Sequence, residues 1–204
     1  LEEGRNFSVM SALEALLRLR QASCHSGLLP NQTAASSSKI DLLMERLLEL
    51  TSAGHKALVF SQWTKFLDRI EIHLYKNSLS FVRLDGSTKH RDKVVSTFQS
   101  PEGPSIFLAS LKAGGTGLNL TAADHVFLMD PWWNVAAEQQ AIDRTHRIGQ
   151  HKPIYATRFI IADSIEERIL ALQQKKALCF DGAIGGDATS MGKLSAEDMS
   201  FLFK

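Results

Sequence analysis

The sequence lacks the hallmarks of several protein classes. Its two cysteines, Cys24 and Cys179, lie far apart and outside any CxxC pair, which is typical of reduced thiols in an intracellular protein and excludes a zinc-finger spacing. Apolar runs are only a few residues long, so no segment is expected to span a membrane. The 23 basic and 22 acidic residues leave a net charge of +1. Any contact with nucleic acid must therefore use a local patch rather than a polycationic chain.

Two common phosphate-binding signatures are absent as well. Neither a G-x-x-x-x-G-K-[ST] run nor a G-x-G-x-x-G run occurs anywhere in the chain. The 204 residues, of which 44% are hydrophobic, are enough for one globular domain with a sizeable core and small appendages. The start at Leu1 has no signal-peptide character and suggests a piece of a longer protein.

Strand and helix patterns alternate along most of the chain. Short apolar runs predict strands, buried on both faces, at 57–60, 81–84, 105–109, 125–129 and 154–161. Amphipathic spacing predicts helices at 9–24, at 40–48 with Gly54 to end it, at 63–74, 94–98, 135–147 and 164–178. After a Gly-rich linker at 182–194, Ser195 and Asp198 have the spacing of a helix cap. The alternation favours a parallel sheet covered by helices.

In such sheets ligands bind where the strands end, so four loops are of interest. Ser61 and Gln62 stand where a helix would begin and could hold a phosphate, or Ser61 could simply cap the helix. After the next strand, Gly86 permits a close approach of a ligand, and Ser87 or Thr88 could touch a phosphate oxygen. An ordinary turn with a helix cap would also explain this second loop.

The next two loops are richer in chemistry. Lys112 precedes three glycines within positions 114–117, and consecutive glycines let backbone amides point at one anion. After the fourth strand, Trp132 and Trp133 are adjacent in the sequence. At least one of them is expected in the core or an interface, and the other could stack on a base or sugar. Core packing of both is the simpler alternative.

A polar segment, 138–150, completes the set. Its Arg144 and Arg147 are three residues apart and share a helix face, a placement that suits a polyphosphate. Alternatively, Asp143 and Arg147 are four apart and could form a solvent-exposed ion pair. His146 has no evident partner ligands, so we interpret it as a packing or hydrogen-bonding residue.

Together and in this order, the segments resemble the C-terminal RecA-like lobe of Swi/Snf-type ATPases, which are helicase-like DNA translocases of superfamily two. The resemblance runs from about residue 10 to about 180 and is carried by 18–25, 57–63, 84–88, 110–121 and 140–150, the last with the run Asp-Arg-Thr-His-Arg-Ile-Gly-Gln. It implies an α/β, RecA-like parallel sheet with helices on both faces. It divides the chain into a helical N-terminal segment and loop (1–38), the lobe (39–181), and a linker with a short C-terminal tail (182–204).

The resemblance implies roles for residues at matching positions. Arg144 and Arg147 match arginine fingers that reach the γ-phosphate of ATP, an effect worth ~10³–10⁵ in rate in related phosphoryl transfer. The residues expected at the nucleotide are Gly115, Gly117 and Gln150. The residues expected on the DNA backbone are Ser61, Gln62, Gly86, Ser87, Lys112, Asn119 and Trp133. No residue is expected to bind a metal.

ATP and Mg²⁺ are the cofactors that the resemblance implies, bound mainly by a first lobe before Leu1. A complete motor needs a Walker A lysine and an Asp-Glu pair, and neither occurs here, so we expect no ATP hydrolysis by this chain alone. The expected partners are double-stranded DNA, the N-terminal lobe of the same protein, and DNA-bound proteins such as nucleosomes. The expected location is intracellular and DNA-associated, in a nucleus or a bacterial cytoplasm.

Two other functions stay open at this point. One is a non-catalytic module that binds DNA or protein and retains only the fold. The other is a lobe of an RNA helicase, against which the Trp-Trp-Asn loop at 132–134 and the Arg-Ile-Gly-Gln ending at 147–150 speak by resemblance alone.

Overall fold

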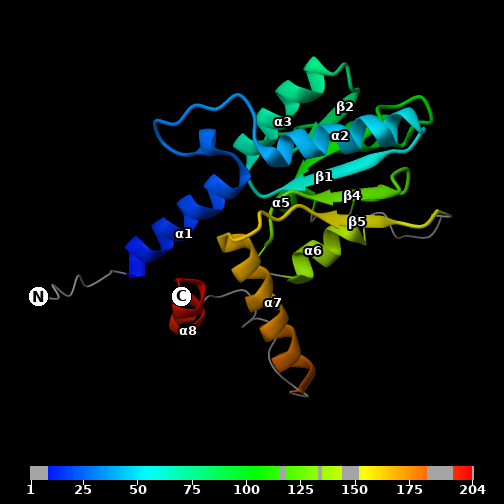
Figure 1. Cartoon of the computed structure of the whole chain (residues 1–204). Helices are drawn as coiled ribbons and strands as arrows, with labels where there is room; N and C mark the ends of the chain where they lie inside the picture. The colour runs from blue at the N-terminus through cyan, green and yellow to red at the C-terminus, as the bar shows by residue number, and fades with distance from the viewer. Residues whose placement is uncertain (1–8, 115–117, 133–134, 144–151, 183–194, 204) are drawn as a thin grey trace, which may run out of the picture.

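The computed structural model describes residues 9–114, 118–132, 135–143, 152–182 and 195–203. Five parallel strands form one sheet in the order β2-β3-β1-β4-β5 (Figure 1). In chain order the elements are α1 (Val9–Cys24), η1 (Ser26–Leu28), α2 (Ser38–Ser52), β1 (Ala57–Ser61), α3 (Thr64–Lys76), β2 (Phe81–Leu84), α4 (Arg91–Gln99), β3 (Ile106–Ser110), α5 (Leu111–Gly114), β4 (His125–Leu128), α6 (Val135–Ile142), β5 (Tyr155–Arg158), α7 (Ile165–Gly182) and α8 (Ala196–Phe203). The predicted alternation of strands and helices is confirmed.

Helices cover both faces of the sheet, which gives three layers (Figure 1). Successive residues of the central strand β1 point to opposite sides. Ala57 and Val59 lie in one buried cluster with side chains of α2 and α3. Leu58 and Phe60 lie in a second cluster with side chains of α4, α5 and α6. A strand covered on both faces needs apolar residues at every position, which explains the unbroken apolar run of β1.

The two edge strands differ from the expectation that every strand is buried on both faces. All four residues of β5 are exposed, and the first three residues of β2 are only partly buried. The strand β5 is also shorter than the apolar run 154–161 suggested. An edge strand has one neighbour instead of two, so less of it is covered, and side chains such as Tyr155 and Arg158 tolerate contact with water.

Local signals set the ends of several helices. The Ser37 hydroxyl accepts a hydrogen bond from the Ile40 N–H at the start of α2. Gly54 follows this helix at φ +78°, a conformation that glycine adopts without strain, so the predicted helix end is confirmed. At the start of α8, Ser195 and Asp198 form the predicted cap. Each donates its backbone N–H to the side chain of the other, at 2.8 and 3.1 Å.

The first and last helices pack together on α7, to one side of the sheet (Figure 1). Leu16 of α1 and Leu202 of α8 are buried there against Ile165, Ile169 and Leu172 of α7. The N-terminal segment and the C-terminal tail therefore share one small core. Within the described residues, no helix combines the length and the apolar character needed to cross a membrane.

Candidate functional site

The carboxyl ends of adjacent strands bring the described candidate residues to one edge of the sheet. Gly86 and Ser87 follow β2, Lys112 follows β3, and Gln62 follows β1. These three strands are neighbours in the order β2-β3-β1. With about 4.8 Å between strands, their ends span about 10 Å. The sequence predicted that these loops gather, and the sheet order adds that the Lys112 loop lies between the other two.

The turn after β2 presents Gly86 and Ser87 to solvent. Asp85 shapes the turn, because its Oδ1 accepts hydrogen bonds from the Ser87 N–H (2.9 Å) and hydroxyl (2.6 Å), and its Oδ2 accepts one from Arg83 Nε (3.0 Å). The Ser87 hydroxyl is the largest cause that lowers the pKa of Asp85, so this side chain stays a carboxylate. A Cβ on Gly86 would meet nothing within 4 Å, so packing inside the described chain does not require glycine there.

Ser61, at the end of β1, is buried and points inward. Its hydroxyl donates a hydrogen bond to Asp130 Oδ2 and accepts one from the Trp63 N–H (3.0 Å). The Asp130 oxygens also accept the Gln62 N–H at 3.3 Å. The helix cap that the sequence suggested for Ser61 is not observed, because Trp63 is the N-cap residue of α3 and no side chain caps this helix. Ser61 and Asp130 instead hold the loop that carries the half-buried Gln62. A direct contact of Ser61 with phosphate stays a prediction.

Four charged side chains are buried near the carboxyl ends of β1 and β4: Arg20, Lys39, Asp130 and Glu166. Lys39 Nζ donates to Glu166 Oε1 (2.7 Å) and to the Met129 carbonyl (2.6 Å). Arg20 Nη2 donates to the Pro131 carbonyl at 3.0 Å. The fourth is Asp130, whose pKa burial raises, while the Ser61 hydroxyl and the charges of Arg20 and Lys39 act in the opposite direction. Two basic and two acidic side chains meet here, and their hydrogen bonds fasten α1, α2 and α7 to the strand ends.

No role was predicted from the sequence for the residues of this cluster. Arg20 lies in the segment 18–25 that carries part of the family resemblance, and this was the only signal available. Cys24, next to the cluster, is a buried free thiol, as expected of a reduced intracellular cysteine. Burial raises the pKa of this thiol well above its usual value, so it stays protonated and unreactive.

Glu138 of α6 holds the loop after β4 and was also missed. Its carboxylate is fully buried and accepts the Trp132 N–H at 2.6 Å and Arg158 Nε at 2.8 Å. Gln173 Nε2 of α7 donates to the Trp132 carbonyl. Trp132 packs against the core, as predicted for at least one tryptophan of the pair. From the sequence, Glu138 shows only as an acidic residue in the first turn of a helix.

The loop after β3 begins with the short helix α5. Lys112 is exposed there, and the Ser110 hydroxyl accepts the Ala113 N–H at 3.3 Å. Further along, Asn119 is exposed and its carbonyl accepts a hydrogen bond from Gln99 Nε2 (3.1 Å). The remaining site residues lie outside the described residues, so their roles stay predictions: Gly115, Gly117, Trp133, Arg144, Arg147 and Gln150.

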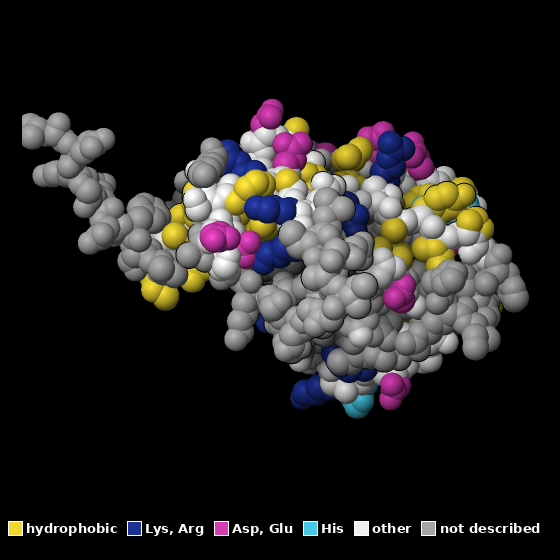
Figure 2. Space-filling model, turned by 90° about the horizontal axis from the view of Figure 1, so that it is seen from below, with side chains coloured by type: hydrophobic (Ala, Val, Ile, Leu, Met, Phe, Trp, Pro, Cys, Tyr) yellow, Lys and Arg dark blue, Asp and Glu magenta, His cyan; other side chains and the backbone are white. Residues whose placement is uncertain are grey.

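Charge on the surface is mixed. On the face shown in Figure 2, the described Lys and Arg side chains are interspersed with Asp and Glu rather than gathered in one broad patch. This agrees with the net charge of +1 and with the expectation that a contact with nucleic acid would be local.

Comparison with known proteins identifies the family. Residues 38–149, more than half of the chain, match the family model described as the helicase conserved C-terminal domain. The chain belongs to this family. Over 169 residues, this helicase C-terminal domain is 47% identical to the DNA repair protein RAD5A of Arabidopsis thaliana, which covers 82% of the chain and 16% of that protein. Over 156 residues it is 50% identical to the human helicase-like transcription factor, covering 74% of the chain and 16% of that protein.

Further relatives agree. The helicase C-terminal domain is 46% identical over 172 residues to the ATP-dependent helicase rhp16 of Schizosaccharomyces pombe, covering 82% of the chain and 20% of that protein. A crystal structure of the C-terminal part of the Fun30 ATPase domain matches with a TM-score of 0.69 and 34% identity, over 85% of the chain and 54% of that chain. The RecA-like fold and the Swi/Snf-type resemblance are confirmed. The chain spans between about a sixth and a fifth of the length of these curated relatives.

Proposed function

We propose that this helicase C-terminal domain is the second motor lobe of an ATP-driven translocase on double-stranded DNA. The observation that carries the proposal is the gathering of the loops after β2, β3 and β1 at one sheet edge, in a lobe of the Swi/Snf type. The proposal includes a DNA-associated location and DNA-bound proteins such as nucleosomes as partners.

The DNA track of the proposal runs across the three strand ends. They span about 10 Å, and one DNA strand carries a phosphate every 3.4 Å or so of helix axis, so at most about three phosphates could contact these strand ends. Lys112 supplies the positive charge, and Gln62, Ser87 and Asn119 supply polar groups. Gly86, with open space where a Cβ would stand, lets a sugar or phosphate come close to the backbone.

The proposed contribution to ATP hydrolysis comes from Arg144 and Arg147, which follow α6 in the chain. ATP and Mg²⁺ would be held mainly by another lobe, and the two guanidinium groups would stabilise the charge that develops on the γ-phosphate. Gly115, Gly117 and Gln150 would line the same nucleotide cleft. Closure and opening of the two lobes during each ATP cycle would advance the duplex.

The arginine-finger role is tested by Arg147→Ala in the longer protein that contains this lobe. We expect the DNA-stimulated ATPase rate to fall by ~10³–10⁵, because an arginine finger acts on the transition state. Arg46→Ala is the matched control, since Arg46 lies on the surface of α2 and pairs only with a neighbouring glutamate in the described contacts. Retention of DNA-stimulated ATPase activity by Arg147→Ala would refute the assignment. The 204-residue chain, assayed beside it, should not hydrolyse ATP.

The DNA track is tested separately by Lys112→Ala and Gly86→Ala. Lys112→Ala should weaken DNA binding for all sequences alike and reduce the slope of log K against log salt by about 1. The control is Lys76→Ala, at the far end of α3. Gly86→Ala should weaken DNA binding while the folding stability stays within about 0.5 kcal/mol of wild type, because the fold leaves space for a Cβ. Unchanged DNA binding in both variants would contradict the track, and DNA binding without stimulated ATPase activity would favour a non-catalytic module.

A further inference from the structure

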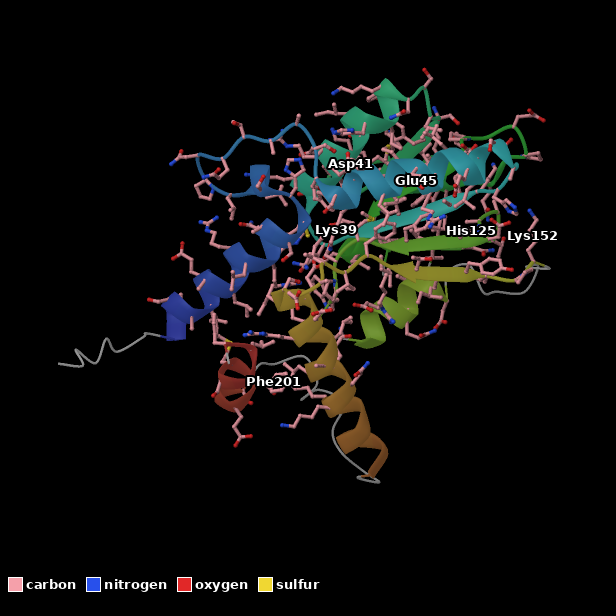
Figure 3. All side chains as sticks on the ribbon, viewed as in Figure 1. Lys39, Asp41, Glu45, His125, Lys152 and Phe201 are labelled. Atoms are coloured by element: carbon pink, nitrogen blue, oxygen red, sulfur yellow. The ribbon has the colours of Figure 1, made fainter. Side chains whose placement is uncertain are left out.

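Three potential metal ligands converge where β1 and β4 begin. This end of the sheet is opposite to the carboxyl ends of the strands, where the candidate site lies. His55 Nδ1 lies 2.7 Å from Asp124 Oδ2, and His125 Nδ1 lies 2.9 Å from Asp124 Oδ1. The ligand atoms of the three residues all lie within 4.8 Å of one another. Figure 3 labels His125 at this end of the sheet.

Backbone hydrogen bonds hold the three residues in place. The Lys56 carbonyl accepts the N–H of Asp124 (3.1 Å) and the N–H of His125 (3.3 Å), which joins the starts of β1 and β4. On the other side, Tyr155 of β5 donates its N–H to the Asp124 carbonyl (2.9 Å) and stacks its ring on His125. The convergence therefore rests on three paired strands rather than on a loose loop, as a preorganised ligand set requires.

We propose that His55, Asp124 and His125 form a binding site for a divalent first-row transition metal ion, with Zn²⁺ as its representative. Two imidazole nitrogens and one carboxylate oxygen are ligands that such ions accept, and water can complete the coordination. Mg²⁺ and Ca²⁺ prefer oxygen ligands throughout, so this ligand set disfavours them. Asp124 is 2% exposed, whereas the His55 side chain is 39% exposed, which leaves a route for the ion from solvent.

The geometry needs only a small adjustment to accept the ion. Bonds of about 2.0–2.2 Å from a tetrahedral ion place neighbouring ligand atoms about 3.4 Å apart. The separation from His55 Nδ1 to Asp124 Oδ2 (2.7 Å) must therefore widen by about 0.7 Å, and that from His125 Nδ1 to Asp124 Oδ1 (2.9 Å) by about 0.5 Å. Slight rotations of both imidazole rings can supply these changes. Each imidazole would bind the ion through Nδ1 and carry a proton on Nε2, so its Nδ1 contact with Asp124 would be replaced by a bond to the ion.

Charge at the cluster also suits a cation. Burial acts to raise the pKa of Asp124, but hydrogen bonds from His55 and His125 outweigh burial, and the pKa lies below its usual value. The side chain is thus a carboxylate at neutral pH, as a ligand must be. Lys152 Nζ lies 3.3 Å from Asp124 Oδ2 on a side chain that is 58% exposed (Figure 3 labels Lys152 beside His125). We expect the metal ion to compete with this ammonium group for Asp124.

The site does not depend on the proposed DNA and ATP contacts. The five residues of β1 separate the metal ligands, at the start of the strand, from the candidate site at its carboxyl end by about 16 Å, at roughly 3.3 Å per residue. A bound ion would instead cross-link the starts of β1 and β4. If the proposed translocase function were refuted, the metal site could still exist. If the metal site were refuted, the proposed function would be unaffected.

The test is calorimetric titration of the metal-free 204-residue chain with Zn²⁺ alone. We expect one Zn²⁺ ion to bind per chain with saturation. The affinity for Zn²⁺ should fall at least tenfold in His55→Gln and in His125→Gln. His73→Gln is the matched control, because His73 lies on α3 outside the cluster and should leave the affinity unchanged. Lys152→Gln should tighten binding severalfold, because it removes the competing cation. If the three residues were only hydrogen-bonded to one another and bound no metal ion, removal of Lys152 would not tighten Zn²⁺ binding.

A second measurement separates loss of the site from loss of the fold. Circular dichroism establishes that each variant is folded, and His55→Gln disturbs the core least because His55 is the most exposed ligand. Zn²⁺ in excess of its Kd should raise the unfolding midpoint of the wild-type chain, since it binds the native state, and should not raise that of His55→Gln. If the wild-type chain shows no saturable binding of Zn²⁺, the site does not exist. Saturable binding of one Zn²⁺ ion by both histidine variants would refute the site equally.

Discussion

Replacing Glu138 with alanine tests how the loop after β4 is held. The change removes two short hydrogen bonds, from the Trp132 N–H at 2.6 Å and from Arg158 Nε at 2.8 Å. Arg158 is 42% exposed and can turn to water, so little of its contribution is lost. The Trp132 N–H lies in a partly buried hydrogen bond, and a donor that is left there without a partner costs up to about 1–3 kcal/mol. With the space left by the side chain, we expect a loss of about 2–4 kcal/mol in the free energy of unfolding.

Equilibrium unfolding in urea measures this loss. At about 2 kcal/mol per molar urea, the transition midpoint should fall by roughly 1–2 M. Glu138→Gln keeps the shape and one acceptor oxygen, so it should lose about half as much. Glu49→Ala is the matched control, since Glu49 is an exposed glutamate of α2 paired with Arg46. Its effect should stay within about 0.5 kcal/mol.

If Glu138→Ala unfolds at the same urea concentration as Glu49→Ala, the buried carboxylate does not hold the loop. If Glu138→Gln loses as much as Glu138→Ala, the charge rather than the shape carries the effect, and the estimate from the Trp132 N–H is wrong.

Three further changes follow from single contacts. Gly103→Ala places a Cβ 2.0 Å from the Thr97 carbonyl oxygen, so it should destabilise the chain by about 1–3 kcal/mol in urea unfolding; wild-type stability would contradict this. Because the Ser87 hydrogen bond holds the pKa of Asp85 below its unfolded value, Asp85 stabilises the native state above that value, and this stability is lost as the pH falls through the lowered pKa. The stability difference between wild type and Asp85→Asn should therefore shrink as the pH falls from about 5 to 2, and a constant difference would exclude the linkage. Ser195→Ala should weaken α8 by about 1 kcal/mol, seen as faster amide exchange in that helix, whereas unchanged exchange would show that packing alone holds it.

The sequence by itself determined the local structure and the family of this protein. Apolar runs of four or five residues set the central strands, because a strand covered on both faces must be apolar throughout. Ser195 with Asp198, and Gly54, fixed helix ends, because caps depend on residues only a few positions apart. The order of the loop segments along the sequence was enough to indicate a Swi/Snf-type lobe.

The tertiary structure decided which polar residues are buried and which meet. Ser61, next to an exposed loop in the sequence, turns inward because Asp130 lies beside it at the end of the neighbouring strand β4. Glu138 is buried because α7 and β5 fold over it. His55 comes to Asp124, 69 residues away, only because β1 and β4 pair in register. Such contacts depend on strand order and helix packing, and neither periodicity nor local propensity carries that information.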